Sequence, residues 1–193
     1  MSSNNYHFIT QWRMRASVEE IADILGNGPD LVRWWPSVYL DVQELEPGDE
    51  NGVGKVVGLY TKGWLPYTLR WQFRISENRH PYGFSLEAWG DFVGRGIWTF
   101  TSDGEYVDVT YDWLIKAEKP LLRTLSFILK PLFGANHQWA MKKGRESLEL
   151  ELARRRARTE AELAAIPPPP GPTFGILMRK PRETVVILDQ ADQ

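Results

Sequence analysis

The chain has 193 residues, of which 42% are hydrophobic, and a formal net charge of −2 at pH 7. This length and apolar content suffice for one domain with a hydrophobic core, and the near-neutral charge gives no electrostatic basis for nucleic-acid binding. The lack of cysteine excludes disulfides, thiolate metal ligands and a cysteine nucleophile. Because the segment from Met1 to His7 is polar and has no signal-peptide character, we expect a cytoplasmic protein.

The first predicted elements are a strand and two short helices. Residues 6–16 alternate between polar and apolar side chains, as a half-buried strand does. Ser17 and Glu20 form a capping-box pattern, which predicts that a short helix begins after the serine. A second helical turn is expected over residues 29–35, where Pro36 stops it.

Five or six strands are predicted to follow, separated by turns rich in glycine, proline and asparagine or aspartate. The expected strands cover residues 38–45, 53–62, 67–76, 82–91, 94–101 and 106–117. Apolar residues alternate with polar ones in several of them, so the sheet should have a single buried face. This order of elements predicts an α+β fold in which helices cover one face of an antiparallel sheet.

The main covering helix is predicted over residues 131–148. Phe133, His137 and Met141 recur there at helical spacing and belong to one stripe that must be buried. Gly144 lies in the same stripe and would let the sheet or a ligand approach the helix axis closely. These features predict a helix-grip fold, in which a curved antiparallel sheet wraps around the long C-terminal helix and encloses a cavity.

The order of these elements, together with five short motifs, resembles the START-like (SRPBCC) superfamily and, within it, the polyketide cyclase/dehydrase-like proteins. The resemblance covers residues 6–156, and the motifs are Trp34-Trp35-Pro36, Leu65-Pro66-Tyr67, residues 90–94, Tyr111-Asp112-Trp113 and residues 133–148. It implies an elongated cavity for hydrophobic or aromatic small molecules, lipids among them. It implies no universal catalytic residue, because the superfamily includes carriers, cyclases and proteins of unknown role.

The sequence changes character after Leu152. Residues 153–165 are expected to form an exposed helical extension, and the proline run that follows ends it and begins a polyproline-like linker. We therefore expect one START-like ligand-binding domain over residues 1–165, followed by a Pro-rich linker and tail over residues 166–193. The apolar run 185–188 has strand character, so we favour docking of the tail on this or a neighbouring molecule over a free tail.

Residues 120–133 form a further amphipathic segment, in which six leucine and isoleucine residues are taken as the apolar members. One interpretation is that this segment touches a membrane during ligand exchange, with its basic side chains toward the headgroups. The preferred interpretation is that it covers the entrance of the cavity. The segment is too short and too charged to span a bilayer.

A set of mostly aromatic side chains is expected to line the cavity and bind its ligand. The set consists of Trp71, Phe73, Trp98, Tyr111, Trp113, Phe133, His137 and Met141. Such a wall favours flat or polycyclic ligands through ring stacking and apolar burial. Trp34 and Trp35 are expected to anchor the short helices rather than to bind ligand directly. Asn136 is expected to point to the flank of its helix.

His137 and Glu87 are the two candidate catalytic residues. His137 has the ordinary pKa of a general acid or base, but a structural hydrogen bond to a strand carbonyl is the preferred interpretation. Glu87 and Trp89 are two residues apart in a predicted strand, so their side chains point to the same face of the sheet. Glu87 would enter the cavity if the tryptophan side chains of this strand face inward, but a position on the solvated face is the preferred interpretation. The three histidines lack ligand spacing, so no metal is expected, and no cofactor motif is present.

Taken together, the sequence predicts a protein that binds, and in one version transports, a hydrophobic or aromatic small molecule. Two alternatives stay open. The resemblance suggests a polyketide aromatase/cyclase or dehydratase, and the Pro-rich tail suggests a protein-interaction module. The expected partner is a small molecule rather than a nucleic acid or a membrane, with oligomerisation through the tail as an additional alternative.

Overall fold

The computed structural model describes residues 5–117 and 120–174, and for residues 117 and 120–130 it describes the backbone only. The elements and their bounds, in chain order, are β1 (Asn5–Met14), α1 (Val18–Leu25), the 3₁₀ turn η1 (Gly28–Asp30), α2 (Leu31–Trp34), β2 (Tyr39–Glu46), β3 (Val56–Lys62), β4 (Thr68–Asn78), β5 (Gly83–Gly90), β6 (Phe92–Asp103), β7 (Tyr106–Ala117), α3 (Pro120–Arg156) and α4 (Glu160–Ala165).

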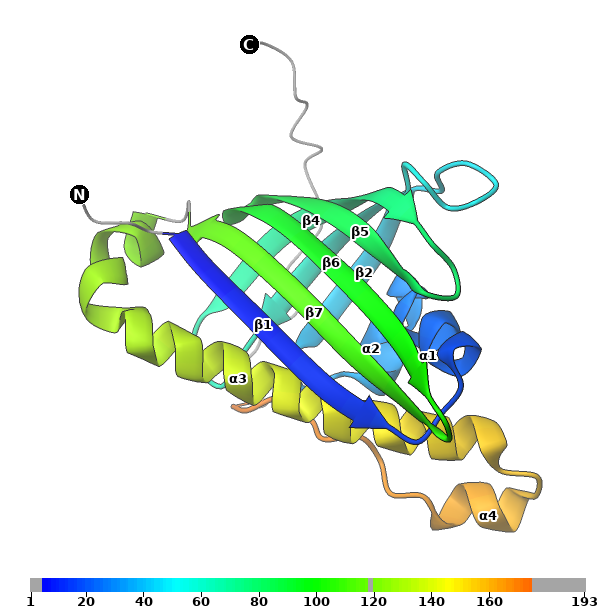
Figure 1. Ribbon diagram of the computed structural model, residues 1–193. Helices are drawn as coiled ribbons and strands as arrows, with labels where there is room; N and C mark the ends of the chain where they lie inside the picture. Colours follow the sequence, from blue (N-terminus) through cyan, green and yellow to red (C-terminus); the bar gives the residue numbers. More distant parts are fainter. Residues whose placement is uncertain (1–4, 118–119, 175–193) are drawn as a thin grey trace.

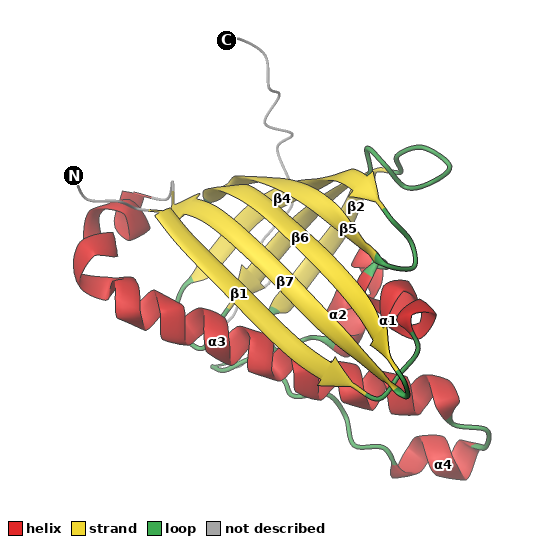
Figure 2. Ribbon diagram, viewed as in Figure 1, coloured by secondary structure: helices red, strands yellow, loops and turns green. Residues whose placement is uncertain are grey.

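Seven strands of the described chain form one antiparallel sheet in the order β1-β7-β6-β5-β4-β3-β2. The sheet is strongly curved, and α3 runs diagonally along its inner side (Figure 1). The short helices α1 and α2 lie together at one end of the curve (Figure 2). The predicted α+β helix-grip class is therefore confirmed, with six strands after the two short helices.

The start of α1 has the predicted capping box. The Ser17 hydroxyl accepts a hydrogen bond from the Glu20 amide at 3.2 Å, and the Glu20 carboxylate accepts one from the Ser17 amide at 2.9 Å. The helix then buries Ile21 and Ile24 completely in the main hydrophobic cluster. Helix α1 thereby closes one end of the space between the sheet and α3.

Helix α3 begins earlier than the sequence predicts. It is a 37-residue helix that contains Pro131, although a proline inside a helix removes one amide donor and clashes with the preceding turn. The sequence predicts a separate segment over the cavity entrance for residues 120–133, but in the structure they form the first part of α3. Most of their side chains lie outside the described part of the chain. The long helix ends at Arg156, so the helical extension expected over residues 153–165 is interrupted before α4. Thr159 caps the start of α4, where its hydroxyl accepts a hydrogen bond from the Glu162 amide.

The Pro-rich residues 166–174 run back from α4 beside α3 toward the end of β3 (Figure 1). The Arg154 guanidinium donates a hydrogen bond to the Pro167 carbonyl near one end of this segment. At its other end, the Thr173 hydroxyl lies 3.4 Å from both the Gly63 and the Trp64 carbonyl oxygens. The apolar run 185–188, for which docking is expected, lies outside the described residues.

Among the described residues, no helix is long and apolar enough to cross a membrane.

Candidate functional site

A pocket lies between the inner face of the sheet and α3, and we call it the inner pocket. Its volume is about 160 Å³, and apolar and aromatic side chains from β1, β4, β7 and α3 make up most of its wall. A deep pocket of about 70 Å³ adjoins it and reaches the end of α1. The two pockets share five lining residues, namely Trp35, Tyr39, Trp71, Tyr111 and Met141. Together they offer space for one small ring system rather than for a large polycyclic ligand.

The residues expected to bind ligand fall around these two pockets. The inner pocket is lined by Trp71, Tyr111, Trp113, Phe133, His137 and Met141. Phe73 and Trp98 line the deep pocket. The strand residues of this set lie on the inner face because side chains alternate across each strand, and the helical ones share the buried stripe of α3.

The aromatic side chains of the wall hold one another in place. The Tyr111 ring stacks on Trp98 with centroids 4.0 Å apart and on Trp113 with centroids 5.4 Å apart. Trp71 lies 5.8 Å from Trp113 and donates its indole N–H to the Thr61 hydroxyl at 3.0 Å. A wall of mutually packed rings is preorganised for a flat ligand, because little rotamer freedom is left to lose on binding.

Four tyrosines line the inner pocket, and two of them, Tyr39 and Tyr111, lie in a largely apolar setting. Burial raises the pKa of both Tyr39 and Tyr111 well above the ordinary value for tyrosine, and the nearby Tyr39 raises the pKa of Tyr111 further. Both phenols are therefore neutral at physiological pH and can donate a hydrogen bond to a ligand oxygen.

Trp35 has a larger role than expected, because its ring lies on the wall of both pockets instead of serving only to anchor the short helices. Trp34 is fully buried in the core, as an anchor should be. Among the strand tryptophans, Trp12 is also a core residue, and its ring packs edge-on against Trp35 at 6.1 Å.

His137 lies on the wall of the inner pocket and faces β1. Its imidazole stacks on the Phe8 ring with centroids 4.2 Å apart, and its Nε2 atom lies 3.5 Å from the Thr10 hydroxyl. The strand partner is thus a side chain and a ring, not the main-chain carbonyl that the sequence interpretation favours. Burial lowers the pKa of His137 to about 4, so the imidazole is neutral at pH 7.

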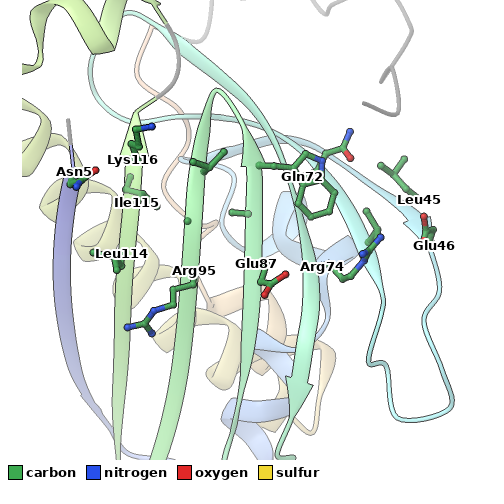
Figure 3. Close-up of a pocket in the computed structure, with 15 residues that line it drawn as sticks. Asn5, Leu45, Glu46, Gln72, Arg74, Glu87, Arg95, Leu114, Ile115 and Lys116 are labelled. Carbon is green, nitrogen blue, oxygen red and sulfur yellow. The ribbon is translucent and has the colours of Figure 1, made fainter. Parts of the chain in front are cut away.

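Glu87 lies on the opposite face of the sheet. Its neighbours Leu86 and Ala88 are buried on the inner face, whereas Glu87 is exposed in a trough on the outer face, together with Trp89. Figure 3 shows its carboxylate between Arg95 on β6 and Arg74 on β4. The tryptophan phase of β5 therefore faces outward, so Glu87 lies on the solvated face, which is the preferred interpretation of its sequence, and it does not meet His137.

Lys62 and Asn136 are among the polar residues of the inner pocket that are absent from the sequence-based set. Asn136 does not point to the flank, because its Oδ1 atom accepts a hydrogen bond from the Leu65 amide at 3.1 Å. Its position next to His137 is only a weak signal of a place on the pocket wall. The buried face of a helix can be wide enough to include residues beside those that recur at three- and four-residue spacing. Nothing in the local sequence marks Lys62, because a lysine at a strand end is ordinarily solvated.

Within the described residues, no three His, Asp or Glu side chains come close enough together to hold a metal ion.

Solved structures with a similar fold are found among known proteins, but no protein matches by sequence. No family model and no curated protein matches the sequence. Among solved structures, the aromatase/cyclase ZhuI from Streptomyces sp. R1128 has a TM-score of 0.62 at 15% identity, over 80% of this chain and 97% of that one. A protein from Thermus thermophilus has a TM-score of 0.61 at 14% identity, over 79% of this chain and 100% of that one.

A third similar structure is the di-domain aromatase/cyclase BexL from the BE-7585A biosynthetic pathway. It has a TM-score of 0.57 at 12% identity, and the match covers 81% of this chain and 51% of BexL. At identities this low, the likeness concerns the fold and not the activity. The chain therefore shares the helix-grip fold of these two aromatase/cyclases, the fold that the resemblance of its sequence implies.

Proposed function

We propose that the chain binds a small hydrophobic or aromatic molecule in the inner pocket, as a binding or carrier protein. The observation that carries the proposal is the pocket itself, because a core packed to ordinary density would leave no such space between the sheet and α3. Its wall is mostly aromatic, and a few polar groups are available to orient a ligand, as in small-molecule sites generally.

The acid–base groups favour binding over turnover. General acid–base catalysis works best when the pKa of the catalytic group lies near the working pH. Burial holds the pKa of His137 at about 4, so at pH 7 it is a hydrogen-bonding group rather than a proton donor. The other candidate, Glu87, lies in the trough on the outer face.

Aromatic cyclisation is the second candidate function. It is favoured by the place of His137 on the pocket wall and by the fold that the chain shares with two aromatase/cyclases. In that case, the neutral imidazole of His137 would have to act as a base toward the bound molecule. Conversion of a bound polyketide mimic, measured by mass spectrometry and lost in His137→Gln, would replace the binding proposal by this one.

The binding proposal is tested by titration calorimetry with 2-naphthamide, a neutral molecule of two fused rings. Ala140 lies on the pocket wall, so Ala140→Phe should fill the space and weaken binding at least about tenfold, while the melting temperature is retained. The matched control is Val93→Phe, which adds a phenyl ring in the trough on the outer face. Equal binding to the wild type and Ala140→Phe would place the ligand elsewhere and overturn the proposal.

A further inference from the structure

The inner pocket opens to solvent at the end formed by Tyr67 and Phe133. Both side chains are partly exposed, whereas Trp35 and Met141, which also line the deep pocket, are buried. Burial raises the pKa of Tyr67 to about 12 and raises the pKa of Tyr39, at the deep end, further. The mouth of the inner pocket therefore lies between the start of β4 and α3.

One side of this mouth is the loop of residues 63–67 between β3 and β4. Gly63 and Tyr67 of the loop line the inner pocket, and the Tyr67 ring packs edge-on against the Phe133 ring with centroids 6.2 Å apart. A loop that few hydrogen bonds hold in place opens at a low cost in free energy, and such loops commonly control access to a site. The contacts that hold this loop therefore decide how readily the inner pocket opens.

Helix α3 provides the first of two attachments for the loop. The Asn136 Oδ1 atom accepts the hydrogen bond from the Leu65 amide at 3.1 Å. Gly63 lies so close to the same side chain that a β-carbon at position 63 would be 2.1 Å from Oδ1. The loop thus rests directly on α3.

The Pro-rich segment provides the second attachment. Its Thr173 hydroxyl lies 3.4 Å from the carbonyl oxygens of Gly63 and Trp64, which belong to the loop. The other hydrogen bond of the loop to a separate described part of the chain is the one between Leu65 and Asn136. The loop is therefore held between two elements, α3 and the Pro-rich segment.

Lys62 fixes Thr173 in this position from the outer side of β3. Thr61 faces the inner pocket, where its hydroxyl accepts from the Trp71 indole, so the next side chain along the strand points to the other face. There the Lys62 ammonium donates a hydrogen bond to the Thr173 carbonyl, and the Phe174 ring lies 5.3 Å from Nζ. Among the described residues, no carboxylate pairs with this ammonium, so the Thr173 carbonyl is its principal acceptor.

The Pro-rich segment is suited to carry a constraint from one end to the other. Residues 167–170 and 172 are prolines, and a proline-rich chain is a semi-rigid spacer rather than a flexible coil. The far end is tied to α3, because the Arg154 guanidinium donates a hydrogen bond to the Pro167 carbonyl. A stiff segment that is attached at both ends limits the movement of the loop it contacts.

We propose that residues 166–174 form a strap, which holds the loop 63–67 against α3 and so controls how fast a ligand enters and leaves the inner pocket. This inference rests on the proposed function, since it names how access to that same pocket is regulated. None of residues 166–174 lines the inner pocket. The strap should therefore affect the rates of ligand exchange and leave the affinity nearly unchanged.

The test follows 2-naphthamide by stopped-flow fluorescence, which gives the rate constants of association and dissociation. Lys62→Met/Thr173→Val removes the ammonium and the hydroxyl but keeps the sizes of both side chains. Both rate constants should rise about tenfold, the effect of losing these hydrogen bonds in the closed state, while Kd changes less than about twofold. The matched control, Lys142→Met/Thr101→Val, makes the same replacements at two exposed positions and should leave both rate constants unchanged.

Hydrogen exchange tests the strap without any ligand. The Leu65 amide should exchange about tenfold faster in Lys62→Met/Thr173→Val, because the loop leaves α3 more often. Residues 57–60 of β3, which pair with both neighbouring strands, should keep their exchange rates. If the double variant does not fold, Arg154→Met decides, since it loosens the far end of the strap and should cause a smaller rise in the same rates.

The outcomes separate this inference from the function on which it rests. Absence of 2-naphthamide binding would overturn the proposed function, and exchange at Leu65 would still decide whether the strap holds the loop. Binding with unchanged rate constants in the folded double variant, or in Arg154→Met where the double variant does not fold, would overturn the inference alone. A rise in the dissociation rate constant alone would also overturn it, because the strap would then stabilise the bound ligand and not the closed mouth.

Discussion

The Trp35 ring lies directly against the backbone of Gly144, so closely that a β-carbon at position 144 would be 2.2 Å from the indole Cζ2 atom. The sequence predicts that this glycine admits the sheet or a ligand, but the group it admits is an aromatic side chain from the end of α2. The contact fixes the ring that forms part of both pocket walls. Gly144 therefore shapes the site indirectly.

The first prediction concerns Gly144→Ala. The added methyl group would force the Trp35 ring to shift in a packed core, and such overpacking costs about 1–3 kcal/mol, which exceeds the gain of about 1 kcal/mol or less in helix propensity. We expect a lower free energy of unfolding in urea and weaker binding of 2-naphthamide.

The control for that prediction is Gly134→Ala in the same helix. A β-carbon at position 134 meets no atom of the protein within 4 Å, so helix propensity alone should act. This variant should be more stable than the wild type by about 0.5–1 kcal/mol. A stabilised Gly144→Ala would show that Trp35 moves away without cost.

The second prediction is that His137 titrates near pH 4. Its pKa in the folded protein lies below the ordinary value of about 6.5, so between those values the unfolded chain binds more protons than the folded one. The stabilising effect of a neutral His137 is thus complete above pH 6.5 and is lost as the pH falls toward 4. The ring signals of His137, followed by NMR, should shift near pH 4, and a titration near pH 6.5 would contradict the buried geometry.

The variant His137→Gln provides a thermodynamic check of the same prediction. It removes the stack on Phe8 and should be less stable than the wild type at pH 7.5, because glutamine leaves part of that ring face unpacked. The stability difference should then shrink between pH 6.5 and pH 4, since only the wild type carries the histidine. A difference that does not vary with pH would mean that His137 stays accessible to protons in the fold.

The third prediction concerns Asn136→Ala. The variant leaves the Leu65 amide without its acceptor, and loss of one hydrogen bond to a partly buried group costs about 1 kcal/mol. Hydrogen exchange at Leu65 should be faster in the variant. The Lys62 amide, which donates to the Val38 carbonyl at 2.9 Å, should keep its exchange rate. Faster exchange at both amides would indicate general loosening of the fold instead.

The sequence predicts the fold well because the relevant signals are local and periodic. The Ser17 capping box, the alternation in the strands and the stripe through Met141 each follow from the spacing of neighbouring residues. The start of α3 is different. Pro131 is a strong helix-breaking signal, yet the helix continues through it, because one missing amide donor does not end a 37-residue helix.

The polar part of the site could not be predicted in the same way. The place of Lys62 depends on Thr173, 111 positions further along the chain, and no periodic pattern links the two residues. Tryptophan is a poor marker of the inward face near Glu87, because Trp89 lies on the outer face, where Arg74 stacks over its ring at 5.8 Å. A large aromatic residue indicates burial of its ring, but not the face of the sheet on which it lies.

The last prediction concerns the ion pair that joins α2 to the C-terminal part of α3. The Glu151 carboxylate is almost fully buried and accepts hydrogen bonds from the Arg33 guanidinium at 2.7 and 2.8 Å and from Arg155 at 2.9 Å. Burial alone would raise the pKa of Glu151, but these two guanidinium groups outweigh it and hold the pKa below the ordinary value. Arg33→Met leaves the buried carboxylate with one partner and should cost about 1–3 kcal/mol at pH 7.

The matched control is Arg13→Met, because Arg13 also binds two carboxylates, those of Asp103 and Asp108, but all three side chains are about half exposed. Exposed pairs contribute little, so this variant should melt close to the wild type. In Arg33→Met the pKa of Glu151 should rise, so Glu151 is protonated more readily and its buried charge is removed. The difference in the free energy of unfolding between the variant and the wild type should therefore shrink as the pH falls from 7 toward 4. Urea unfolding at several pH values measures this, and an equal loss at every pH would mean that Arg33 acts through packing of its stem and not through its charge.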